Sequence, residues 1–174
     1  MFSNLIRIQA TIVYAIVALV VALFVVYLGF MTRYYVLFFD GTFEMFEYYK
    51  QLQVFNKEAF NIALLFIVMA ALIYVFGLSN YRPGLASLGA VIGATAFVTM
   101  RSLALLNVLP IYKKGYLALD FAEMEDYIPT TFAFDAASLI HYLLIGAFAL
   151  LTLVAIVSFI QRIREGHPLI RKFQ

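Results

Sequence analysis

Four long apolar stretches dominate the pattern of hydrophobic and polar positions along the chain. They cover approximately Ile8–Met31, Ala59–Leu78, Leu85–Leu109 and Ala136–Ile160, and shorter polar segments separate them. At about 1.5 Å per residue, each stretch is long enough to cross a hydrocarbon layer about 30 Å thick as a helix. The pattern therefore predicts an all-α integral membrane protein with four transmembrane helices.

Local signals place the ends of the predicted helices. Asn56 and Asp135 are suitable N-caps for the second and fourth helices, because their short side chains accept hydrogen bonds from free backbone N–H groups. The run Ser79–Gly84 predicts a tight turn between the second and third helices. Pro110 is expected to end the third helix, because proline disfavours helical geometry in the residue before it.

The two halves of the chain resemble each other at a fixed spacing. The motif Glu44-Met45-Phe46-Glu47-Tyr48 is followed 79 positions later by Glu123-Met124-Glu125-Asp126-Tyr127, and Phe55 is matched in the same way by Phe134. A fixed period predicts a duplicated unit, so residues 1–80 are interpreted as a first membrane repeat and residues 81–174 as a second. Each repeat contains two helices joined by an outer loop. The alternative is two similar helix starts built from common residues.

Composition supports a lipid environment for most of the chain. Hydrophobic residues make up 65% of the 174 residues and charged residues 13%, whereas ordinary globular domains are about half apolar and about a quarter charged. Cysteine is absent, which excludes disulfides, thiolate metal sites and a cysteine nucleophile. No cofactor-binding motif is evident in the sequence, so no cofactor is expected.

The distribution of basic residues predicts the direction in which the chain crosses the membrane. Arg7 and Arg82 fall on one side, together with a basic C-terminal tail. The basic residues of the tail are Arg162, Arg164, Arg171 and Lys172. By the positive-inside rule both termini are predicted to be cytoplasmic and the two repeats to run parallel, with the plasma membrane as the expected location. The tail is interpreted as a cytoplasmic anchor on anionic lipid.

The two loops on the opposite side are acidic and rich in aromatic residues. In the first, aromatic residues recur at helical spacing between charged ones, which predicts an amphipathic helix lying on the outer surface over Thr42–Val54. Six acids form a predicted outer acidic surface: Glu44, Glu47, Glu123, Glu125, Asp126 and Asp135. A solvated surface is favoured over a cation site, because the alternating oxygen ligands of known calcium loops are missing. No metal site is predicted.

Polar side chains also occur inside the predicted membrane segments. Arg101 lies on the order of 13 Å below the outer boundary, where a charge costs at least a few kcal/mol unless it is paired or hydrated. Asn61, His141 and Asn107 are expected close to the same level. These four residues define a candidate intramembrane polar site.

Two interpretations of this candidate site remain open. In the first, Arg101 faces the bundle interior and, with His141, forms an outward-opening pocket for an anionic group. In the second, Arg101 extends to the outer headgroups and pairs with Asp135 or Glu123, and His141 is a packing residue with satisfied hydrogen bonds. The second interpretation is favoured, because one arginine and one histidine are a weak signal for a binding site.

Small residues predict close helix packing in the third stretch. Gly89 and Gly93 form a small-xxx-small pair, and such pairs let two helices approach closely. The third helix is therefore expected to be central in the bundle.

Three classes of function fit these observations. The lack of catalytic motifs, the short tails and the aromatic outer loops favour a structural or accessory subunit of a larger membrane protein complex. A small transporter or channel-forming oligomer with a polar site near Arg101 is the second hypothesis. The third is an enzyme that modifies outer-leaflet lipid, with His141 and the outer acids as acid–base groups. The expected partners are the lipid bilayer and other integral membrane subunits or further copies of this chain. No nucleic-acid partner is expected.

Overall fold

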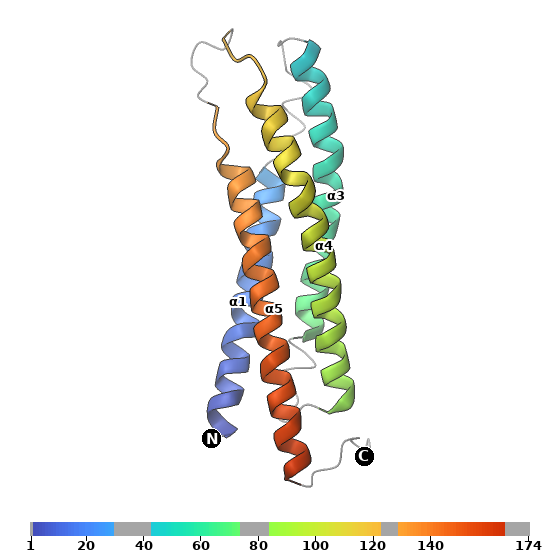
Figure 1. Ribbon diagram of the computed structural model, residues 1–174, viewed down its shortest axis with the longest axis vertical. Coiled ribbons are helices and arrows are strands. Elements are labelled where there is room, and N and C mark those ends of the chain that lie inside the picture. Colours follow the sequence, from blue (N-terminus) through green and yellow to red (C-terminus); the bar gives the residue numbers. More distant parts are fainter. Residues whose placement is uncertain (1, 30–42, 74–83, 123–128, 166–174) are drawn as a thin grey trace.

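The computed structural model describes residues 2–29, 43–73, 84–122 and 129–165. In these ranges the chain forms four helices, α1 (Phe2–Gly29), α3 (Phe43–Ile73), α4 (Leu85–Leu117) and α5 (Phe132–Arg164), which run side by side along one long axis (Figure 1). Each helix contains a stretch that is long and apolar enough to cross a membrane. The predicted all-helical architecture with four candidate membrane spans is therefore confirmed.

The four helices form a closed ring of neighbours. Helix α1 packs against α3 and α5, and α4 packs against the same two helices from the other side. Helices α1 and α4 therefore occupy opposite corners of the bundle (Figure 1). This arrangement makes α4 no more central than the other three helices, contrary to the expectation drawn from Gly89 and Gly93.

Buried residues follow α1 and α5 at alternating spacings of three and four. In α5 the buried residues are Phe134, Ala137, His141, Leu144, Phe148, Leu151, Ala155, Ser158 and Arg162. This is the spacing of side chains that interlock along the seams of a left-handed helix bundle. Large apolar side chains such as Leu139, Leu150 and Leu153 are exposed on the other faces of α5, as expected of a helix whose solvent is lipid.

Charged residues mark the two ends of the bundle. Arg7, Arg162 and Arg164 lie near one end, which we call the basic end. The opposite end, which we call the aromatic end, is formed by the start of α3 and the end of α4. Helix α5 has no charged residue between Asp135 and Arg162, and α3 has none after Glu58 among its described residues. The helices thus share an apolar belt, in which Arg101 is the one charged residue of the described ranges.

Helices α3 and α4 extend past the other two at the aromatic end (Figure 1). The Tyr48 hydroxyl donates a 2.8 Å hydrogen bond to the carbonyl oxygen of Tyr112, and the Phe55 and Tyr112 rings lie 4.6 Å apart. A side chain at Gly115 would place its Cβ 3.0 Å from the Tyr48 ring, so only glycine fits there without a shift. Tyr48 and Phe55 therefore pack on α4.

These contacts explain why predicted helix ends were wrong. The separate surface helix expected over Thr42–Val54 is instead the first part of the continuous helix α3, which leaves Asn56 in mid-helix. Pro110 lies inside α4, because the packing of Tyr112 and later residues on α3 outweighs the backbone hydrogen bond that proline removes. The N-cap of α5 is Thr131, so Asp135 lies in the first turn. The turn predicted over Ser79–Gly84 lies outside the described residues, except for its last residue.

Candidate functional site

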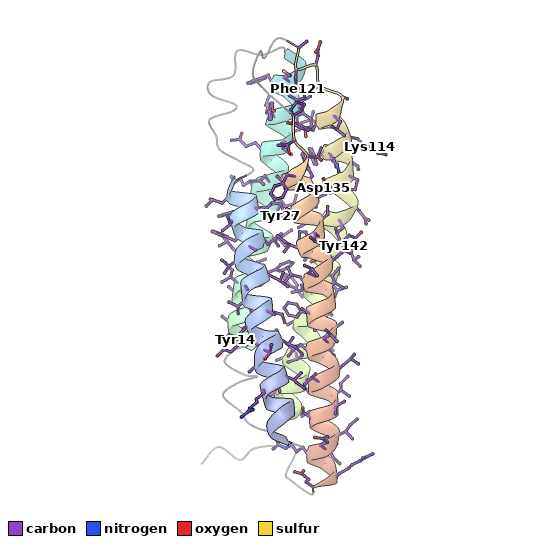
Figure 2. All side chains as sticks on the ribbon, turned by 90° about the vertical axis from the view of Figure 1, so that its left-hand side faces the viewer. Tyr14, Tyr27, Lys114, Phe121, Asp135 and Tyr142 are labelled. Carbon is purple, nitrogen blue, oxygen red and sulfur yellow. The ribbon has the colours of Figure 1, made fainter. Side chains whose placement is uncertain are left out.

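A chain of hydrogen bonds crosses the interior of the bundle at His141 on α5. The His141 Nε2 atom lies 2.8 Å from the Tyr27 hydroxyl on α1, and its Nδ1 atom lies 3.0 Å from the Ser102 hydroxyl on α4. All three side chains are at most 1% exposed. Figure 2 shows Tyr27 in the part of α1 toward the aromatic end. Three helices are thus joined through one imidazole ring.

Asn56 brings the fourth helix into this chain. Its side-chain Nδ2 donates a 3.0 Å hydrogen bond to the carbonyl oxygen of Tyr27. This carbonyl belongs to the last turn of α1, where backbone acceptors have no partner within the helix. Asn56 is therefore a capping residue, but it caps the end of α1 from the side and not the start of its own helix.

The surroundings of His141 are apolar and its hydrogen bonds are complete. The Phe66 ring meets the His141 ring edge-on at 6.3 Å. A neutral imidazole donates from one nitrogen and accepts at the other, so either tautomer satisfies both hydroxyl partners. Among the described side chains, no buried polar atom lacks a hydrogen-bond partner. This polar cluster therefore joins three helices, and each ring nitrogen of His141 has a hydroxyl partner.

Only one of the four residues predicted for an intramembrane polar site lies in the interior. His141 is buried, whereas Asn61, Arg101 and Asn107 are exposed. The Arg101 guanidinium lies 5.8 Å from the centre of the Phe97 ring. The pocket interpretation expected Arg101 to face the bundle interior. Arg101 is instead exposed.

The position of Arg101 follows from the stripe that α4 buries. Val98, Ser102 and Leu105 point inward, so the residue directly before Ser102 is rotated about 100° away from Ser102 around the helix. The second interpretation expected Arg101 to pair with Glu123, which lies outside the described residues, or with Asp135. Asp135 instead pairs with Lys113 at 2.6 Å.

The predicted outer acidic surface is described only in part. Glu47 lies 3.8 Å from Lys50, and Asp135 accepts a second hydrogen bond from the Thr131 hydroxyl at 2.9 Å. The side chain of Glu44 and the residues Glu123, Glu125 and Asp126 lie outside the described part of the structure. Within the described part, no group of three acids or histidines could hold a metal ion.

The basic residues of the predicted anchor are described only in part. Arg162 is only 6% exposed, and Gln9, Ser87 and Ser158 are also buried near this end. Arg164 is exposed, whereas Arg171 and Lys172 lie outside the described residues. Arg162 therefore turns toward the bundle instead of reaching for headgroups.

Gly89 and Gly93 face away from the bundle. Both are exposed, and a Cβ added at either position would meet nothing within 4 Å. Their helical spacing therefore serves no contact among the described residues of this chain.

Comparison with known protein families, with curated proteins and with solved structures finds no match. Function is therefore inferred from the placement of side chains alone. Two features need an explanation beyond the fold of one chain: a cation exposed within the apolar belt, and an open glycine face on the same helix.

Proposed function

We propose that this protein is a structural or accessory subunit of a larger membrane protein complex and that α4 contacts the partner. The observation that carries the proposal is the exposure of Arg101 within the apolar belt. On insertion scales, placing a charge that faces lipid costs about 3 kcal/mol. The Phe97 ring 5.8 Å away offsets about 1 kcal/mol of this. A partner helix that offers a carboxylate or free carbonyl groups removes the rest.

The face of α4 that carries Gly89 and Gly93 also supports α4 as the helix that contacts the partner. Gly89 and Gly93 leave open space in which a second helix can approach closely. Asn107 lies five full turns beyond Gly89, so it shares this face and can hydrogen-bond across an interface. Arg101 lies about 80° around the helix from Gly93 and about 120° from Gly89, so it is at the side of this face and not on it. These features suit a helix-to-helix contact with another integral membrane chain.

A pair of glycine substitutions tests the contact. Gly93→Leu is expected to reduce recovery of the partner by about tenfold on native purification, because a leucine keeps the two helices apart. The matched control is Gly146→Leu on α5, another glycine whose added Cβ meets nothing within 4 Å. Both variants should match the wild-type chain in melting temperature. Equal partner recovery for the two variants would contradict the proposed contact on α4.

A second function deserves a test, because the exposure of Arg101 also fits a pore between copies of this chain. In that case native purification yields a homo-oligomer without other chains, and liposomes containing it conduct anions in a manner that depends on Arg101. A stoichiometric foreign partner and no conductance support the accessory subunit instead. The third hypothesis, a lipid-modifying enzyme, is not supported by the burial of His141, whose 0% exposure keeps it from an outer-leaflet substrate.

We also propose that the basic end faces the cytoplasm of a cell bounded by the plasma membrane, by the positive-inside rule. The chain contains no cysteine, so single cysteines can be labelled without background. Lys114→Cys at the aromatic end is expected to react with an impermeant maleimide added outside intact cells, whereas Ile163→Cys at the basic end is expected to react only after lysis. The reverse pattern would invert the proposed orientation.

The tandem repeat of two membrane units stays a prediction from the sequence. It is supported by Phe55 and Phe134, which are both buried and lie 79 positions apart. Leu65 is exposed, however, whereas its counterpart Leu144 is buried. Superposition of α1 and α3 on α4 and α5 tests the duplication, which requires a rotation axis close to the membrane normal.

A further inference from the structure

A lipid-facing groove follows the seam between α1 and α3. Two cavities lie along it. The first, near the aromatic end, has a volume of about 670 Å³ and is lined by Leu28, Gln53, Lys57 and Phe60, among others. The second, nearer the basic end, has a volume of about 300 Å³, and its lining includes Val17, Val21, Ile67 and Ala71. Figure 2 shows α1, which forms one wall, with Tyr27 labelled toward the aromatic end and Tyr14 labelled near the middle of the helix.

The two cavities lie in line along the same seam. On α1 their lining residues Val17, Val21 and Leu28 fall on one stripe with spacings of four and seven, which places them on the same side of the helix. On α3 the corresponding stripe runs from Lys57 to Ala71. Between the cavities, the partly exposed Phe24 and Phe60 rings pack against each other at 4.8 Å across the seam. An acyl chain that occupies both cavities passes over the outer side of these rings.

The polarity of the groove changes along its length. At the mouth, Lys57 and Gln53 offer an ammonium and an amide. Lys57 makes no ion pair among the described residues, and its acidic neighbour Glu58 points about 100° away around the helix. The second cavity is lined almost wholly by apolar side chains. Lys57 and Ala71 are separated by about 21 Å along α3, which exceeds the roughly 15 Å half-thickness of a hydrocarbon layer.

We propose that the groove between α1 and α3 binds one phospholipid, with its phosphate at Lys57 and an acyl chain along the apolar stripe. The level of Lys57 fits this occupant, because the residue lies just where the charge-free part of α3 begins. A cation at the edge of the apolar belt attracts an anionic headgroup, while the apolar lining below buries a hydrocarbon chain. Bound in this way, the lipid fills the outer side of the seam and connects α1 to α3.

Native mass spectrometry of the delipidated full-length chain tests this proposal. The probes are a phosphatidylglycerol and a diacylglycerol with the same acyl chains, which differ only in the phosphate headgroup. The wild-type chain is expected to bind phosphatidylglycerol about tenfold more tightly than diacylglycerol. Lys57→Gln should weaken phosphatidylglycerol binding about fivefold without changing diacylglycerol binding. Ala71→Phe should abolish binding of both, because the ring fills the apolar part of the groove.

Two substitutions outside the groove serve as controls. Lys114→Gln removes an exposed lysine from α4, and Ala149→Phe adds a ring to an exposed position of α5. Both should bind phosphatidylglycerol as the wild-type chain does. The proposal is overturned if the wild-type chain does not distinguish the two lipids, if Lys114→Gln matches Lys57→Gln, or if Ala71→Phe retains lipid. A second copy of the chain in the groove would show as a dimer that Ala71→Phe dissociates, and this result would also overturn it.

Discussion

Replacing His141 with leucine is expected to lower the free energy of unfolding by about 2–4 kcal/mol. The substitution removes two hydrogen bonds, which in membrane proteins average about 0.6 kcal/mol each. It also leaves the hydroxyls of Tyr27 and Ser102 buried without their observed partner. Each orphaned buried group costs about 1–3 kcal/mol, so the orphaned hydroxyls and not the lost bonds decide the size of the effect.

A further variant separates the effect of the lost hydrogen-bond partner from the effect of the lost packing of the histidine ring. A triple variant, His141→Leu with Tyr27→Phe and Ser102→Ala, has no hydroxyl left in the chain of hydrogen bonds. It is expected to recover to within about 1 kcal/mol of the wild-type value, because replacing all partners with apolar groups is nearly neutral. Tyr142→Leu, at the exposed neighbouring position, is the control and should change little. Unfolding in mixed micelles measures all three variants. A triple variant no more stable than His141→Leu would show that packing around the ring dominates.

The membrane spans could be predicted from sequence, whereas the helix ends at the aromatic end could not. An apolar stretch of sufficient length is a local property, so the spans follow from composition along the chain. The extension of α3 and α4 depends instead on contacts such as that between Tyr48 and Tyr112, which are 64 residues apart. Local signals at Asn56 and Pro110 suggested helix ends that these distant contacts override.

The candidate site illustrates a second limit of sequence reasoning. The depth of Arg101 in the membrane follows from counting residues, but its direction depends on which stripe of α4 is buried. The apolar residues Val98 and Leu105 carry that information, since they flank Ser102 at spacings of four and three. Extending this stripe would have placed Ser102 inward and Arg101 at its edge. The link from Ser102 to His141 still requires the pairing of α4 with α5, which no local pattern fixes.

The substitution Asn56→Leu is expected to lower the free energy of unfolding by about 1–3 kcal/mol. Leucine has the same number and branching of side-chain heavy atoms as asparagine, but it leaves the Tyr27 carbonyl at the end of α1 without its buried donor. The loss should concentrate in the last turn of α1, so hydrogen exchange there should accelerate more than exchange in the middle of α5.

Asn61→Leu is the matched control for this prediction, because Asn61 lies on the same helix and is exposed within the apolar belt. Removing an exposed amide from a lipid-facing surface should leave stability unchanged or raise it. The two asparagines therefore predict opposite outcomes for the same chemical change, measured in the same detergent. If both variants have the same free energy of unfolding, the hydrogen bond from Asn56 contributes nothing to holding α3 against α1. The chain of polar contacts at His141 would then join three helices and not four.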